Sequence, residues 1–219
     1  MANHGLVIFD LDGTLFEGQK ATLPAVQRAF QEMGLPQPDP REILSFIGKP
    51  AHVWHAWLYS HGPQEKAAQL VAAIDRYELD FIAEKAQLFP GIPEALAEIR
   101  AFVGRMAICT NGPPAYVERV IADHRLRRFF DKVRHPHSVD DTKVSMVREL
   151  LEQLGGRPGV VVGDRRDDVR AAHENGLRAV AAGYGYGDAA ELSAADAAVA
   201  SPAELPGAIR SLFRNWDAS

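Results

Sequence analysis

Short apolar runs alternate with amphipathic stretches along most of the chain. Apolar runs bounded by turn residues are typical of buried parallel strands, and they lie at residues 6–9, 106–109, 160–162 and 179–182, with a weaker one at 197–199. The spacing of apolar residues between them predicts helices that begin near Pro93 and after Pro114, and helices over residues 143–154 and 169–175. The alternation predicts an α/β fold with a doubly wound, Rossmann-like parallel sheet.

Residues 17–88 break this alternation, because their apolar residues recur at helical spacing and form no convincing strand. We therefore expect a core domain made of residues 1–16 and 89–219, with an inserted α-helical cap domain at residues 17–88. The segments expected to act as hinges are residues 16–18 and 86–91, which contain or adjoin glycine.

Polar residues follow three of the predicted strands at the point where each strand ends. Asp10 follows the first run, Thr110 and Asn111 follow the second, and Asp164 follows the third. In open parallel sheets, ligands bind beyond the carboxyl ends of the strands. The sequence therefore predicts one site at this edge of the sheet.

The first of these positions carries two carboxylates, Asp10 and Asp12, two residues apart. Alternate residues of an extended segment point to the same side, so both can face one site. Such a pair suits a two-step phosphoryl transfer, in which one carboxylate attacks phosphorus and the other moves the proton. The structural alternative is an Asx turn that ends the strand, since Asp12-Gly13 is a common turn pair.

A second acidic cluster begins at Asp164, and its carboxylates offer the hard oxygen ligands that Mg²⁺ prefers. Asp168 is the favoured second acid, although helix N-capping explains one of Asp167 and Asp168 and leaves that register open. Lys143 stands at the start of a predicted helix, where its charge could neutralise a transferred phosphoryl group. Thr110 and Asn111 could hold phosphate oxygens.

Together these residues resemble the haloacid dehalogenase-like phosphatase superfamily. The resemblance rests on motifs in the family's order along essentially the whole chain: residues 10–15, Thr110-Asn111-Gly112, Lys143, and residues 162–164 followed by Asp168. The helical insertion is similar to the small cap of phosphoglycolate phosphatase and β-phosphoglucomutase relatives.

The resemblance implies a role for each matched residue. Asp10 would be the nucleophile and a metal ligand, and Asp12 the general acid/base, with its backbone carbonyl also reaching Mg²⁺. Thr110 and the backbone of Asn111 would bind the phosphoryl group and Lys143 would balance its charge. Asp164 and Asp168 would complete the metal site. Dehalogenating members typically lack an acid at the position of Asp12, so cleavage of a carbon–halogen bond is not expected.

The cap segment from Gly48 to Tyr59 is the candidate for substrate selection. Lys49, His52 and His55 are its candidate substrate-binding residues, since a cap that closes over the site can contact the leaving group. The structural alternative has the neighbouring tryptophans in the core of the cap and the histidines exposed.

Composition limits the choice of partner and compartment. The 219 residues carry a net charge of −5 and no basic run, which argues against a nucleic-acid partner. The apolar run at residues 6–9 is too short to span a membrane. The single cysteine, Cys109, excludes an internal disulfide framework, so we expect a cytoplasmic protein. The expected oligomeric state is a monomer or a homodimer.

The favoured function is that of a magnesium-dependent phosphomonoester hydrolase, which acts on a small phosphorylated metabolite through an aspartyl-phosphate on Asp10. One alternative is a phosphomutase, which would use the same aspartates but return the phosphoryl group to a second hydroxyl. Another is a catalytically silent binding protein on the same fold. All the catalytic positions are filled, and this favours an enzyme.

Overall fold

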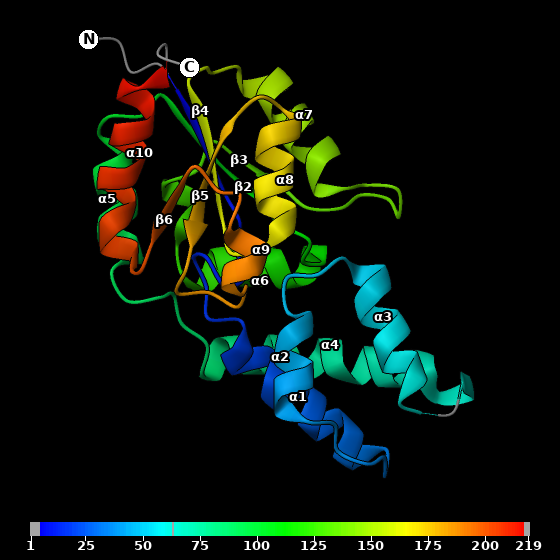
Figure 1. The fold of residues 1–219 in the computed structure, drawn as a ribbon. Coiled ribbons are helices and arrows are strands. Elements are labelled where there is room, and N and C mark those ends of the chain that lie inside the picture. The colour runs from blue at the N-terminus through cyan, green and yellow to red at the C-terminus, as the bar shows by residue number, and fades with distance from the viewer. Residues whose placement is uncertain (1–4, 63, 217–219) are drawn as a thin grey trace.

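A six-stranded parallel sheet forms the centre of the core (Figure 1). The computed structural model describes residues 5–62 and 64–216. The spatial order of the strands is β3-β2-β1-β4-β5-β6. Their bounds are β1 Leu6–Phe9, β2 Arg105–Cys109, β3 Lys132–Arg134, β4 Gly159–Gly163, β5 Arg178–Ala182 and β6 Ala197–Val199.

Alternate residues of the strands pack against helices on opposite faces of the sheet. In β1, Val7 and Phe9 belong to one hydrophobic cluster, whereas Leu6 and Ile8 belong to another. The first face is covered by α5 Ile92–Arg100, α6 Pro114–Asp123 and α10 Leu205–Arg214. The second is covered by α7 Lys143–Leu154 and α8 Arg166–Glu174, with the short α9 Ala189–Leu192 nearby. Because both faces are buried, the central strands β1 and β4 contain no polar side chain.

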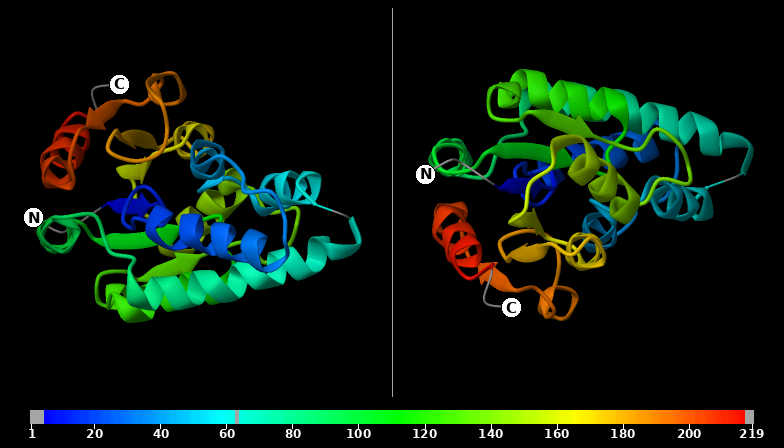
Figure 2. Two further views of the ribbon diagram at one scale, coloured as in Figure 1. Left: turned by 90° about the horizontal axis from the view of Figure 1, so that it is seen from below. Right: turned by 90° about the horizontal axis from the view of Figure 1, so that it is seen from above.

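Helices fill the segment between β1 and α5 and lie beyond the carboxyl edge of the sheet (Figures 1 and 2). They are α1 Gln19–Glu32, α2 Pro40–Phe46, α3 Ala51–Ser60, the 3-10 helix Gln64–Lys66, and α4 Ala67–Glu84. Residues from all four α-helices share a hydrophobic cluster that includes Phe30, Ile43, Leu58 and Ile74. These helices therefore have a core of their own.

The two connections between this helical segment and the sheet lie side by side. Phe16 and Leu88 form an isolated antiparallel bridge. Beside it, the amide of Glu17 donates to the carbonyl of Gln87 at 2.9 Å. The end of α4 is not separate from the sheet domain, because Ile82 packs in the cluster of the sheet.

The predicted α/β doubly wound fold is confirmed. The apolar runs coincide with β1, β2, β4, β5 and β6, and the helix at residues 143–154 has the predicted bounds. The sequence reasoning did not predict β3, α2, α9 or α10. It also began α8 at Val169, whereas the helix begins at Arg166, because the first turn is charged and joins the apolar stripe only at Val169.

None of the helices in the described part of the chain combines the length and the hydrophobicity that a bilayer span requires.

Candidate active site

The site lies where the order of the strands reverses. The chain passes from β1 to β2 on one side of the sheet and later to β4 on the other, so β1 has β2 and β4 as neighbours. Asp10, Thr110 and Asp164 are the first residues after these three strands. This is the topological switch point at which open α/β sheets bind ligands.

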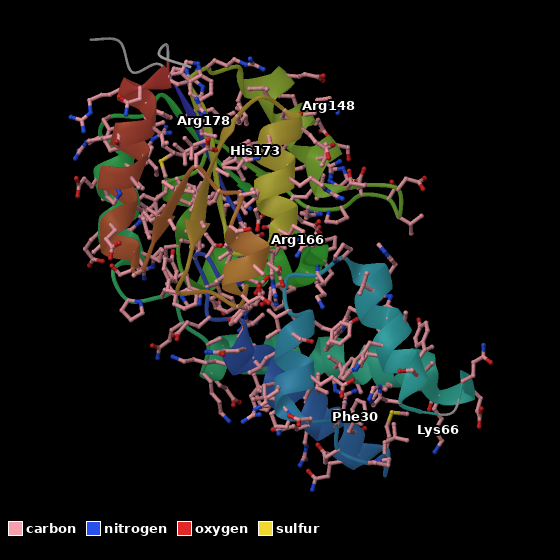
Figure 3. The ribbon with its side chains drawn as sticks, viewed as in Figure 1. Phe30, Lys66, Arg148, Arg166, His173 and Arg178 are labelled. Atoms are coloured by element: carbon pink, nitrogen blue, oxygen red, sulfur yellow. The ribbon has the colours of Figure 1, made fainter. Side chains whose placement is uncertain are left out.

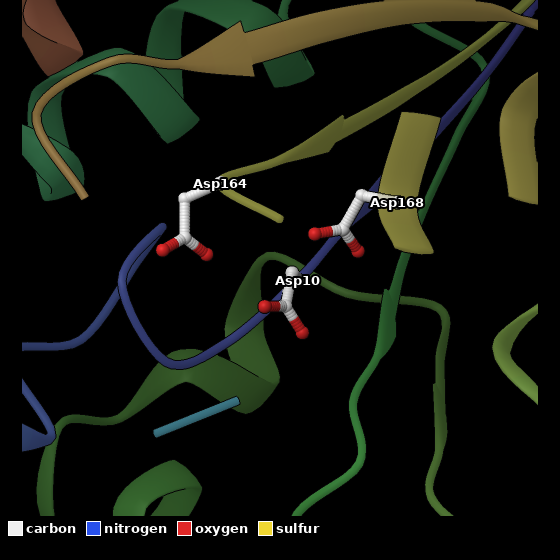
Figure 4. A group of neighbouring side chains, drawn as sticks. All are labelled: Asp10, Asp164 and Asp168. Atoms are coloured by element: carbon white, nitrogen blue, oxygen red, sulfur yellow. The ribbon is translucent and has the colours of Figure 1, made fainter. Parts of the chain in front are cut away.

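Three buried carboxylates converge there, those of Asp10, Asp164 and Asp168 (Figure 4). One oxygen from each lies within 4.8 Å of the others. Asp10 and Asp164 come from strand ends, whereas Asp168 reaches the site from the first turn of α8. Asp167 is only half-buried, and its carboxylate lies 3.5 Å from Arg170. The geometry therefore brings Asp168, and not Asp167, to the cluster.

Lys143 meets this cluster from the first residue of α7, a helix capped by the Thr142 side chain. Its Nζ donates to Asp10 Oδ1 at 2.6 Å. It also lies 2.7 Å from Asp168 Oδ1, an ion pair by distance that lacks hydrogen-bond geometry. Burial alone would lower the pKa of Lys143, but the charges of Asp10 and Asp168 outweigh it and hold the pKa well above its usual range.

The cluster holds more carboxylates than cationic groups. Burial raises the pKa of Asp10 well above its usual range, against the pull of Lys143. Burial and the charge of Asp168 raise the pKa of Asp164 to about 7. Asp10 Oδ2 is buried and accepts no hydrogen bond from the described residues. These oxygens fit a divalent cation with a preference for hard ligands, such as Mg²⁺.

Two glycines let the acids approach one another. At Gly13, φ is +81°, and an added Cβ would lie 2.2 Å from Asp164 Oδ2. At Gly163, an added Cβ would lie 2.0 Å from Asp168 Cγ. A side chain at either position would displace a carboxylate from the cluster.

Asp12 is buried beside the cluster, but its carboxylate has different neighbours. Its Oδ1 accepts a short hydrogen bond from the hydroxyl of Tyr116, in the first turn of α6. Burial raises the pKa of Asp12 to about 6, although the Tyr116 hydrogen bond and the charge of Lys143 pull it down. A carboxyl group with a pKa in this range can give and take a proton near neutral pH.

Thr110 and Asn111 occupy the loop after β2. The Thr110 hydroxyl accepts a 3.1 Å hydrogen bond from the amide of Gly112. The side chain of Asn111 points to the cap and donates to the carbonyl of Gly48 at 2.9 Å. Asn111 therefore links the loop after β2 to the helical segment of residues 17–88.

Two cavities are lined both by the helical segment of residues 17–88, the predicted cap, and by the sheet domain, the core. The inner cavity, about 210 Å³, is lined by Asp12 and Tyr116 of the core. The outer cavity, about 560 Å³, is lined by Lys143 and also by Arg166, which lies at the end of the core nearest the cap (Figure 3). Gly48, Lys49 and Asn111 line both.

The three predicted cap residues do not share one place. Lys49 lines both cavities, and its Nζ lies 4.6 Å from the centre of the Phe46 ring. His55 lines the inner cavity and His52 lines the outer one, and both histidines line a third cavity beside the outer one. Trp54 lines the inner cavity, but Trp57 is buried and donates to Glu42 at 2.7 Å.

Sequence reasoning missed three side chains that complete the site. Tyr116 bonds to Asp12, and Glu78 on α4 lines the inner cavity. Arg165 contacts the cap loop through several hydrogen bonds. Glu78 had a signal, because it stands one helical turn after Ile74 on an otherwise apolar face. For Tyr116 and Arg165 the sequence offers no comparable pattern.

The sequence of this chain is similar to those of known hydrolases. The family model described as haloacid dehalogenase-like hydrolase matches residues 7–182. A 5'-nucleotidase of Pseudomonas aeruginosa is 30% identical over 199 residues, which cover 86% of this chain and 86% of that protein. A phosphoglycolate phosphatase of Yersinia pseudotuberculosis is 30% identical over 219 residues, covering 93% and 92% of the two chains.

A solved structure shows the same arrangement. A haloacid dehalogenase-like hydrolase of Streptococcus pneumoniae superposes with a TM-score of 0.83 at 25% identity. The match covers 95% of this chain and 100% of that one, so it includes the helical segment as well as the sheet.

Proposed function

This chain belongs to the haloacid dehalogenase-like hydrolases, and from that premise we propose a magnesium-dependent phosphomonoester hydrolase that works through an aspartyl-phosphate on Asp10. One observation carries the proposal. Asp10, at the end of the central strand, lies 2.6 Å from Lys143 and within 4.8 Å of two further buried carboxylates. A nucleophile, a balancing cation and hard metal ligands thus share one point.

In the first step, a carboxylate oxygen of Asp10 attacks phosphorus, and the bond between phosphorus and the ester oxygen breaks. Asp12 donates its proton to that oxygen, so the leaving group departs as an alcohol. In the second step, Asp12 accepts a proton from water as the water oxygen attacks phosphorus. The acyl-phosphate bond breaks, inorganic phosphate leaves, and the Asp10 carboxylate is restored.

The remaining residues hold the phosphoryl group and balance its charge. Thr110 and Asn111 would bind phosphoryl oxygens, and Lys143 would offset their charge. Mg²⁺ would be held by Asp10, Asp164 and Asp168, together with the backbone carbonyl of Asp12. When bound, such an ion neutralises phosphoryl oxygens and fixes their orientation.

We further propose that residues 17–88 act as a cap that selects a small phosphorylated metabolite. The inner cavity lies beside Asp12, where the leaving oxygen would be protonated, so the alcohol would occupy it. Two relatives are named a phosphoglycolate phosphatase and a 5'-nucleotidase. Their names suggest leaving alcohols that range from a small carboxylate to a nucleoside. Residues Lys49, His52 and His55 would contact this alcohol or the entrance to it.

The test is phosphate release from a panel of phosphate esters, measured with Mg²⁺ and after exhaustive chelation. We expect release with Mg²⁺, loss on chelation and recovery when Mg²⁺ returns. Full release without a divalent cation, or no release from any ester or from acetyl phosphate, would reject the proposed function.

A further inference from the structure

The inner cavity is too large for a two-carbon leaving group. Its volume is about 210 Å³. Glycolate has five non-hydrogen atoms and would leave much of this space to water. A leaving group that fills the cavity is of the size of a substituted ring.

An aromatic side chain forms one wall of this cavity. Trp54 is half-buried and stacks on Trp57, with ring centres 5.1 Å apart and planes at 24°. Phe46 stacks on the same Trp57 ring at 5.0 Å. Trp57 is thereby fixed between its neighbours and leaves Trp54 and Phe46 to line the cavity. Aromatic faces of this kind favour offset stacking with a planar ring.

Two acids line the same cavity in addition to Asp12. Glu78 is buried, and its one hydrogen bond with a described residue comes from the Thr22 hydroxyl at 2.5 Å. Asp75 also lines the cavity and is exposed. Neither forms an ion pair within the described residues, although Lys49 and His55 also line the cavity. A buried carboxyl group with spare acceptor capacity is stabilised by an N–H donor.

We propose that the inner cavity binds an alcohol bearing a planar, nitrogen-containing ring, stacked on Trp54 with N–H groups that donate to Glu78 and Asp75. A nucleoside with an exocyclic amine is such an alcohol. A carboxylate such as glycolate has no N–H group to donate to Glu78 or Asp75, so neither acid would gain a hydrogen-bond partner from it. Hydrolysis of the phosphate ester of such an alcohol rests on the proposed function, whereas binding of the alcohol alone does not.

The first test compares kcat/KM for matched esters. CMP and UMP differ by an amino against an oxo group, as do AMP and IMP, and phosphoglycolate is the carboxylate. When the assay is run above pH 8, where Glu78 has lost its proton and can only accept, we expect the amine-bearing member of each pair to exceed its oxo partner by about tenfold. Both members of each pair should have a higher kcat/KM than phosphoglycolate. A preference for phosphoglycolate, or equal values within both pairs, would overturn the inference.

Two variants test whether the preference for amine-bearing esters comes from the inner cavity. Glu78→Gln should reduce the amine-to-oxo ratio towards one, because an amide can also donate to an oxo group. Glu84→Gln makes the same change at an exposed position of the same helix and should leave the ratio intact. An unchanged ratio in Glu78→Gln would remove Glu78 from recognition and contradict the inference.

A binding measurement separates failure of the inference from failure of the proposed function. Cytidine and adenosine should quench tryptophan fluorescence of the wild-type protein, glycolate should not, and Trp54→Leu should abolish the quenching. Turnover of acetyl phosphate reports on the proposed function alone. Turnover without quenching by either nucleoside would overturn only the inference, whereas quenching without turnover would reject only the proposed chemistry.

Discussion

Arg165 donates a 2.8 Å hydrogen bond from Nη2 to the carbonyl of Ile47, across the boundary between sheet and cap. Its guanidinium also donates to the carbonyls of Leu44 and Ser45, each at 3.4 Å, at the end of α2. The last carbonyls of a helix lack partners within it and attract positive charge. Arg165 follows Asp164 directly, so the loop that carries a site acid also holds the cap.

We predict that Arg165→Ala loosens the cap without removing the phosphoryl chemistry. Amide hydrogen exchange should rise in residues 44–48, and KM for phosphate esters should rise about tenfold or more as charged hydrogen bonds are lost. Arg166→Ala is the control, because Arg166 is exposed and, among the residues that the structure describes, hydrogen-bonds only through its backbone amide. Equal exchange in residues 44–48 of both variants would show that Arg165 does not hold the cap.

We predict that Asp10→Asn loses at least about a thousandfold in turnover while remaining folded. The amide is a poor nucleophile, but it has the size of the carboxylate and can still accept from Lys143. Phosphate release measures the loss, and circular dichroism with thermal unfolding measures the fold. Wild-type turnover by a folded Asp10→Asn protein would exclude the covalent intermediate.

We predict that Mg²⁺ stabilises the folded protein. Ligand at a hundredfold excess over its Kd contributes about 2.7 kcal/mol, which corresponds to a rise in Tm of about 5 °C or more. Asp164→Ala should abolish this rise, whereas Asp167→Ala should retain it because Asp167 lies outside the cluster. A larger defect for Asp167→Ala than for Asp168→Ala would mean that the wrong acid was assigned to the metal.

The core half of the site could be predicted because its acids stand next to recognisable strands. Asp10 and Asp164 each follow an apolar run, and parallel pairing alone brings two such strand ends together. The prediction of Asp168 also required the register of the first helical turn to be assumed. In the structure α8 begins at Arg166, and this register directs Asp168 to the cluster.

Other contacts of the site could not be predicted, because they are set by packing between distant elements. Tyr116 and Asp12 are 104 residues apart, and α6 must lie over the first strand end for them to meet. Glu78 interrupts an apolar stripe, but the sequence does not show that this face turns to a cavity rather than to the cap core. β3 has one apolar residue between two charged ones, too little for a strand signal.

We predict that Glu78 makes stability fall as pH rises. Burial raises its pKa from 4.5 to about 8; the Thr22 hydrogen bond lowers it, and Asp75 and Asp12 raise it further. Below about pH 4.5 the group is protonated whether folded or unfolded, so its burial is least unfavourable there. Between 4.5 and 8 only the unfolded chain releases the proton, so stability is lost up to about pH 8.

Denaturant unfolding of Glu78→Gln and wild type across this window gives the measurement. The difference in unfolding free energy should grow with pH in favour of Glu78→Gln, by up to roughly 4–5 kcal/mol. Glu84→Gln should track the wild type at every pH, since Glu84 is exposed. A constant difference between Glu78→Gln and wild type would show that Glu78 does not titrate in this range.

We predict that the cap residues alter the ranking of substrates and not the phosphoryl chemistry. His55→Ala should change KM for bulky esters by about tenfold, because His55 lines the inner cavity where the alcohol would lie. His52→Ala should cause a smaller change in KM that is similar for all esters, because His52 lines the outer cavity. Lys49→Ala should show both effects on KM, since Lys49 lines the inner and the outer cavity.

Each cap variant is compared on the ester panel and on acetyl phosphate, whose leaving group is too small to fill the inner cavity. Acetyl phosphate turnover should stay near wild type, because it depends on the core residues around Asp10. Lys66→Ala, at the far end of the cap (Figure 3), is the matched control and should change neither readout. Equal losses on every compound would mean that these residues support folding or catalysis in general, and the assignment of specificity to the cap would be wrong.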